Sequence, residues 1–252
     1  MKKIVPSKIG SHGFSLIEIA VVLFIVALLL GGLLPTLSSQ MEQQRRNETR
    51  KLMEEIRESL LGYVMVNGRL PSPACGTIPT VPGALNNAGI ELIPASAALC
   101  TSGAGDIAVL PWATLGVKET DAWGNRLAYR VTPVFTGAVA AGTSATFLLS
   151  SSGNMSIKES ATGNTIAPNI PVILWSHGPN ACGAYMPSGA RIDDDSSTPA
   201  PIYCANADQQ ENTNNTNTIY VSKTNTSTFD DLVIWISTNT LISRMVAVNK
   251  LP

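Results

Sequence analysis

The pattern of hydrophobic and polar positions is most distinctive at the start of the chain. Between Ile19 and Met41 lie 23 consecutive residues without a formal charge, most of them Leu, Val, Ile, Ala or Phe. A helix needs about 20 apolar residues to cross the hydrocarbon core of a bilayer. The segment 14–37 is therefore predicted to be a transmembrane helix.

Beyond Ser38 the pattern becomes amphipathic and remains helical. Apolar side chains recur at three- and four-residue intervals, as on one helical face: Leu52, Met53, Ile56, Leu60, Tyr63 and Val64. The opposite face offers three i,i+4 ion pairs: Glu42–Arg46, Arg50–Glu54 and Lys51–Glu55. The pattern predicts one helix from about Ser15 to Asn67, roughly 80 Å long, whose second half (38–67) is a stem that packs on a domain.

The remaining residues, 68–252, are predicted to form an exported globular domain. Short segments rich in β-branched and aromatic residues are separated by turn residues, which favours an antiparallel sheet. The predicted strands are Arg126–Phe135, Ala145–Ser150, Pro171–Ser176, Thr218–Ser222 and Asp231–Ser237, followed by a helix within Thr238–Asn249. The stretch Ala74–Val109 is predicted to be an irregular, disulfide-tied loop region with room for a short helix. The polar stretch Ala207–Thr228 is predicted to be a long surface loop or an exposed hairpin. The fold class is α+β, with the long N-terminal helix packed on the sheet.

Charge gives this arrangement a direction across the membrane. Lys2, Lys3 and Lys8 precede the apolar segment, whereas no acidic residue does. Cationic flanks tend to stay in the cytoplasm. The sequence therefore predicts a single pass of the inner membrane with the domain in the periplasm. The sequence contains no basic stripe of the kind that binds nucleic acids, so no nucleic-acid partner is expected.

The four cysteines fit an exported domain. Cys75, Cys100, Cys182 and Cys204 all follow the apolar segment, and their spacing does not suit a zinc site. Disulfides persist in oxidising compartments. Of the three possible pairings we favour Cys75–Cys100 with Cys182–Cys204, because each closes a short loop; four buried free thiols are the alternative.

The leader differs from an ordinary secretory signal. The basic stretch MKKIVPSKIGSHG contains no apolar run, and the apolar run begins only after Gly13. The hexapeptide Gly13-Phe14-Ser15-Leu16-Ile17-Glu18 resembles the class III leader of type IV prepilins and type II secretion pseudopilins. This resemblance implies that a prepilin peptidase removes residues 1–13, cutting after Gly13, and methylates the new N-terminus at Phe14. The apolar helix would then remain in the mature protein.

Glu18 is an acidic residue at the edge of this apolar run. An acidic group at mid-membrane costs about 2.5–3.5 kcal/mol on translocon scales, so such a residue is a functional candidate. The resemblance implies that Glu18 pairs with the N-terminal amine of a neighbouring subunit during assembly, which would neutralise both charges and set the stagger. In the alternative reading Glu18 only reaches out to the membrane interface.

Pro35 lies where pilins usually carry a proline that kinks the helix, and Gly31 and Gly32 precede it. Proline removes a backbone hydrogen bond. Pro35 is therefore expected to kink the helix, and it can at the same time mark the membrane exit.

The segment Asp121-Ala122-Trp123-Gly124-Asn125 resembles the Asp-Pro-Trp-Gly-Asn turn of major pseudopilins, with Ala122 in place of proline. The physical reading is a turn in which the side chains of Asp121 and Asn125 bond to nearby backbone. Trp123 is expected to turn into the core.

Residues for catalysis or metal binding are scarce. His12 lies in the leader, and His177 follows its neighbour Ser176 in a predicted turn, which is not the arrangement of a nucleophile with its base. The run Asp193-Asp194-Asp195 lacks the alternating spacing of a calcium loop. We therefore interpret it as a solvated loop, with a calcium site as the alternative. We expect no cofactor, no catalytic residue and no metal.

The sequence thus favours a minor subunit of a type IV pilus or of a type II secretion pseudopilus, whose partners are the prepilin peptidase, other pilin or pseudopilin subunits and the inner membrane. One alternative is a tip adhesin or substrate-binding module on a pilin anchor. A membrane-anchored periplasmic enzyme is a weaker one, because it would not need Glu18.

Overall fold

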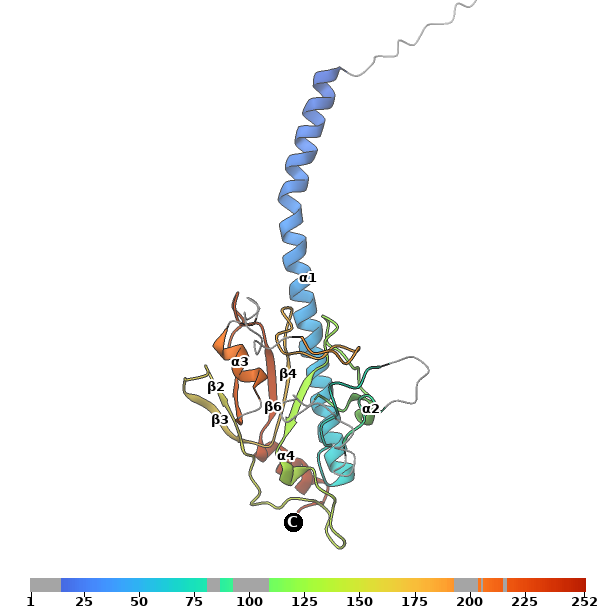
Figure 1. Ribbon diagram of the computed structural model, residues 1–252, viewed down its shortest axis with the longest axis vertical. Coiled ribbons are helices and arrows are strands. Elements are labelled where there is room, and N and C mark those ends of the chain that lie inside the picture. Colours follow the sequence, from blue (N-terminus) through green and yellow to red (C-terminus); the bar gives the residue numbers. More distant parts are fainter. Residues whose placement is uncertain (1–14, 81–86, 93–108, 193–203, 205, 215–216) are drawn as a thin grey trace, which may run out of the picture. The chain divides into compact units, whose positions relative to one another are not determined.

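The computed structural model describes residues 15–80, 87–92, 109–192, 204, 206–214 and 217–252 (Figure 1), leaving aside the side chains of 29–37. The chain divides into two compact units, Met1–Gln44 and Arg45–Pro252. The long helix α1 (Leu16–Asn67) is continuous and belongs to both units. The predicted single helix is therefore confirmed, with bounds close to those expected.

Helix α1 ends at a glycine for a steric reason. Gly68 has φ +70°, and its N–H donates to the carbonyl of Val64 at 2.8 Å. A left-handed residue at this point satisfies a carbonyl of the last turn. A Cβ on Gly68 would collide with the backbone carbonyl of Ser144, so no other residue fits there without a shift.

The stem half of α1 buries the predicted face. Met53, Ile56 and Val64 are completely buried, and Tyr63 is half-buried. Of the predicted ion pairs, Lys51–Glu55 is present at 4.0 Å. Glu54 pairs with Arg57 at 3.1 Å rather than with Arg50, which donates to Asn225 at 3.4 Å.

The described residues of the domain form two three-stranded sheets. In the first, β4 (Val172–Ser176) lies between β1 (Ala128–Val131) and β6 (Leu232–Ile236), and both pairings are antiparallel. In the second, β2 (Met155–Lys158) pairs antiparallel with β3 (Thr165–Ile170) and parallel with β5 (Ile219–Val221). The expectation of a purely antiparallel sheet is therefore corrected. β5 follows β2 only after β3, β4 and α3, and such a long connection permits a parallel pairing.

Helices complete the domain. They are α2 (Trp112–Leu115), a 3₁₀ turn η2 (Pro133–Phe135), α3 (Ala207–Thr213) and α4 (Thr238–Ala247). The predicted C-terminal helix is thus confirmed as α4, which buries Leu241 and Met245. The strands predicted around β1, β4, β5 and β6 are confirmed as well, although β1 is shorter because Pro133 begins η2.

The strand predicted at Ala145–Ser150 is wrong. This segment forms turns: Phe147 is buried against Phe135, with ring centroids 4.8 Å apart, whereas Leu148 and Leu149 are exposed. The polar stretch Ala207–Thr228 contains the predicted strand as β5, but it begins with the helix α3, which neither a loop nor a hairpin includes.

The core joins the stem half of α1 to the first sheet and extends to the second. Leu60 of α1 faces β4 and β6 across a narrow hollow lined by Leu174 and Ile234. Between the two sheets, the rings of Trp175 and Tyr220 lie 5.2 Å apart. The structure is therefore α+β, with the stem packed against small antiparallel and mixed sheets.

Candidate functional site

The first turn of α1 holds Glu18, the residue that the sequence singled out for assembly. The backbone N–H of Ser15 donates to Oε2 of Glu18 at 3.0 Å, and the N–H of Ile17 donates to Oγ of Ser15 at 3.3 Å. This is a capping box, in which the two side chains satisfy two free N–H groups. Sequence reasoning did not assign Ser15 a role, although the spacing Ser-x-x-Glu was the signal for it.

Apolar side chains follow Glu18 on every side of the helix. All the described side chains from 15 to 28 are exposed; Leu16 is 90% exposed and Phe24 is 68% exposed. An apolar surface of this kind marks an interaction site with a protein or a membrane. Within the described residues, no helix satisfies the length and apolarity criteria for crossing a membrane.

The other predicted processing residues are only partly covered. Gly13 and Phe14 lie outside the described residues. Pro35 lies inside the uninterrupted α1, but its side chain is not among those described. The cleavage site and the kink at Pro35 therefore stay predictions.

An ion-pair cluster holds the chain that leaves α1. Arg69 donates to both carboxylate oxygens of Glu91, at 2.7 and 2.8 Å, and Tyr63 Oη and the N–H of Ser72 donate to the same carboxylate. Burial opposes ionisation of Glu91, but these hydrogen bonds outweigh it and lower its pKa. Burial and the bond to Glu91 raise the pKa of Tyr63 to about 12.

The turn at Asp121 has the predicted construction in part. Oδ1 of Asp121 accepts from the N–H groups of Trp123, at 2.9 Å, and Asn125, at 3.0 Å. Its Oδ2 accepts from the hydroxyl of Ser176 at 2.6 Å, which ties the turn to the end of β4. Burial raises the pKa of Asp121 despite these bonds. Trp123 is half-buried against the core rather than fully inserted.

His177 lies next to this turn, in the interior. It is 1% exposed, and its ring meets the Trp175 ring edge-on at 5.9 Å. Burial, helped by the nearby charge of Arg191, lowers the pKa of His177 to about 3. The hydroxyl of Ser176 donates to Asp121. Ser176 and His177 are thus buried and do not form a nucleophile–base pair.

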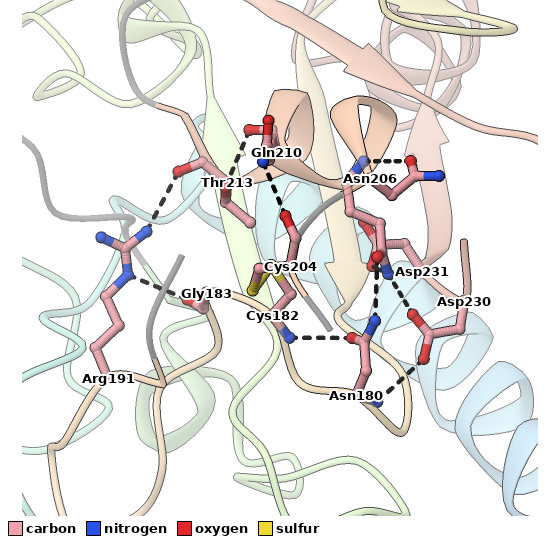
Figure 2. The surroundings of a disulfide bond; sticks show 11 residues. Asn180, Cys182, Gly183, Arg191, Cys204, Asn206, Gln210, Thr213, Asp230 and Asp231 are labelled. Carbon is pink, nitrogen blue, oxygen red and sulfur yellow. Dashed lines mark hydrogen bonds between the residues drawn. A yellow bond between two sulfur atoms is a disulfide. The ribbon is translucent and has the colours of Figure 1, made fainter. Parts of the chain in front are cut away.

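The predicted disulfide between Cys182 and Cys204 is present, with the Cα atoms 5.3 Å apart (Figure 2). Cys75 is also disulfide-bonded. Cys100 lies outside the described residues, so its pairing with Cys75 stays a prediction. The disulfide links the loop after β4 to the segment that enters α3.

Polar side chains beside this disulfide form a buried cluster that the sequence analysis did not foresee. The N–H of Asn180 donates to Asp230 at 3.0 Å, and the amide of Asn180 donates to Oε1 of Gln209 at 3.0 Å (Figure 2). Asn206 caps α3 by accepting from the N–H groups of Asp208 and Gln209. An Asn at this position favours the start of a helix and was the signal from which α3 could have been predicted.

Metal binding has little support in the described part of the chain. Asp193-Asp194-Asp195 lies outside it, and within it no group of three or more His, Cys, Asp or Glu side chains is placed to hold an ion. The interpretation of the Asp run as a solvated loop, with a calcium site as the alternative, therefore stays a prediction.

Comparison with known proteins adds no family assignment. The chain matches no protein-family model, no curated protein and no solved structure.

Proposed function

We propose that this chain is a minor subunit of a type IV pilus or of a type II secretion pseudopilus. A prepilin peptidase cuts it after Gly13 and methylates Phe14. The mature protein is anchored in the inner membrane by its N-terminal helix, with the domain in the periplasm, until it enters the filament. It acts by assembly and not by catalysis.

The observation that carries the proposal is the combination of Glu18 with the exposed apolar side chains that follow it. Fourteen described residues, 15–28, expose their side chains, and Glu18 is the one charged residue among them. A soluble domain gains nothing from such a surface, which is unfavourable in water. A bilayer, and afterwards the packed helices of a filament, would cover it.

Glu18 has the chemistry to register one subunit on another. Its Oε2 accepts the N–H of Ser15, so the carboxylate is held over the first turn. A carboxylate has about four acceptor positions, so the remaining ones are free to accept an ammonium group. In an apolar surrounding, an ammonium partner would neutralise a charge that is otherwise costly to bury.

The exported domain supports the proposed compartment. Cys182 and Cys204 form a disulfide, and disulfides are typical of proteins outside the cytoplasm. The stem half of α1 is fixed to this domain by its buried face. The stem is therefore committed to the domain, and the exposed residues 15–28 of the same helix are proposed to contact partners.

The test is an assembly assay of the full-length protein in cells that make the filament. We expect Glu18→Ala to remain in the membrane fraction and to be lost from sheared filaments. Glu55→Ala, which removes an exposed carboxylate from the stem of the same helix, is the matched control and should assemble normally. Normal entry of Glu18→Ala into filaments would overturn the proposal.

A further inference from the structure

Two adjacent carboxylates lie buried where α3 meets the start of β6. Asp230 is 8% exposed and Asp231 is 3% exposed, and both immediately precede Leu232, the first residue of β6. Neither belongs to the assembly helix proposed above. Buried carboxylates without a cation are costly, so their surroundings are informative.

The described donors to this pair are all neutral amides. Nε2 of Gln209 donates to Oδ1 of Asp230 and, at 3.3 Å, to Oδ1 of Asp231, so one nitrogen serves two carboxylates. Nδ2 of Asn212 donates to Oδ2 of Asp231 at 2.7 Å. Gln209 and Asn212 are both completely or almost completely buried, and both belong to α3. The carboxylates therefore help to hold α3 in place, together with two hydrogen bonds between the Asn212 side chain and the backbone of Val221.

Charged groups lie near the pair. The charge of Arg46 on α1 favours the ionised form of Asp230, but burial outweighs it. A hollow of about 240 Å³ beside Asp231 is lined by Arg50 and Glu54 of α1 and by Lys223, which follows β5. Arg50 donates to Asn225 at 3.4 Å, and Lys223 pairs with Asp208 of α3.

We propose that Asp230 and Asp231 form a pH-operated latch, which holds α3 on the domain while the pair carries a proton and loosens α3 when both carboxylates are ionised. Two negative charges side by side, away from water and held by amide donors among the described residues, repel each other. Opening α3 would hydrate them. How firmly α3 is held on the domain would then depend on the pH of the compartment outside the inner membrane.

The surroundings of Asp231 determine in which direction the closure of α3 changes with pH. Burial raises its pKa from 3.8 to about 7; the bond from Asn212 opposes this shift and the charge of Asp230 adds to it. Burial raises the pKa of Asp230 as well. The closed state thus keeps a proton that the opened state releases. Closure is strongest below the ordinary aspartate range, weakens as pH rises towards 7, and levels off above it.

α3 is the element that can open without unfolding the domain. It has only seven residues, whereas β6 pairs with β4 along five residues. The disulfide between Cys182 and Cys204 keeps the segment that enters α3 tethered (Figure 2). Opening would therefore be local and reversible, as for other weakly held segments.

The test is backbone hydrogen exchange of the full chain in detergent between pH 5 and 8, corrected for intrinsic exchange. Protection of the peptide Ala207–Thr213 should fall about tenfold per pH unit between pH 5 and 6.5, because opening releases one proton. It should level off above pH 7. Peptides from β4 should not show this slope.

Two variants make the test specific. Asp231→Asn keeps the shape of the side chain without its charge, and it should remove the slope at α3. Glu55→Gln removes an exposed carboxylate on α1 and should behave like the wild type. A pH-independent protection of α3 in the wild type, or an unchanged slope in Asp231→Asn, would overturn the latch. If Asp231→Asn does not fold, the wild-type slope at α3 is still decisive.

Discussion

The two halves of α1 use apolar residues in opposite ways. In residues 15–28 the apolar side chains are exposed all round the helix, and Glu18 is the one charged group. In the stem the apolar side chains form one stripe, buried against the sheets, and charged residues cover the other face. The stem is thus stabilised by its own domain. Among the described residues, the side chains of 15–28 are all exposed and lack such cover.

The largest effect is expected when one apolar side chain is truncated in each half of α1, which tests whether the two halves contribute differently to stability. Ile56→Ala, in the completely buried stripe, should lower the free energy of unfolding by about 2–5 kcal/mol, because it removes packed atoms and leaves a cavity. Phe24→Ala, in the exposed segment, should change it by less than about 0.5 kcal/mol. Denaturant unfolding of the full chain in detergent measures both; equal losses would contradict the division.

The covalent link is expected to have the next largest effect. Replacing Cys182 and Cys204 by Ser should lower the free energy of unfolding by about 2–4 kcal/mol, since the disulfide closes a loop with a sequence separation of 22. Thermal unfolding of the double variant and of the wild type, each with and without reductant, measures the loss. Reductant should have much less effect on the variant, and an equally stable variant would show that the link is dispensable.

A smaller loss is expected where the chain leaves the stem. Arg69→Lys cannot keep the two-pronged contact with Glu91 and should cost about 1–3 kcal/mol. Because the pKa of Glu91 is lowered, this contact stabilises the protein above the ordinary glutamate pKa and is lost as pH falls below it. Wild type and variant should therefore converge in stability at acidic pH, and a gap that does not narrow would count against the ion pair.

The smallest effect is expected for the solvated face of the stem. Lys51→Ala removes an ion pair whose two side chains are mostly exposed, and exposed pairs contribute about 0–1 kcal/mol. Denaturant unfolding should give a change below about 0.5 kcal/mol. A loss comparable to that of Ile56→Ala would mean that charge, and not the buried stripe, fixes the stem.

The sequence predicted those parts of the fold that have a regular hydrophobic period. α1 and its buried stripe, β4, β6 and α4 were all readable in this way, and the short loop between Cys182 and Cys204 favoured the observed disulfide. These elements bury apolar side chains at the spacing of their own secondary structure, which is the main signal in a single sequence.

The missed elements lack that period. β3 is an edge strand that is mostly exposed and contains Pro168, so its sequence does not alternate between apolar and polar residues. α3 buries Gln209, Asn212 and Thr213, which look like surface residues in the sequence. Leu148 and Leu149 caused the reverse error: these apolar residues suggested a strand, but they lie exposed in a turn. Burial of polar groups depends on distant partners such as Asp231, which no local pattern reveals.

The candidate assembly site was only partly readable. Glu18 stood out as a charge beside an apolar run, and its spacing from Ser15 encoded the capping box found at the start of α1. The contacts of Glu18 with another subunit depend on a second chain. They cannot be deduced from one sequence and remain part of the proposal.

The most direct test of the central claim is the mass of the mature N-terminus, measured by intact-protein and peptide mass spectrometry in cells with and without a prepilin peptidase. The account predicts a chain that begins at methylated Phe14 only when the peptidase is present. An uncut chain beginning at Met1 in both strains would contradict it and leave a plain membrane-anchored domain.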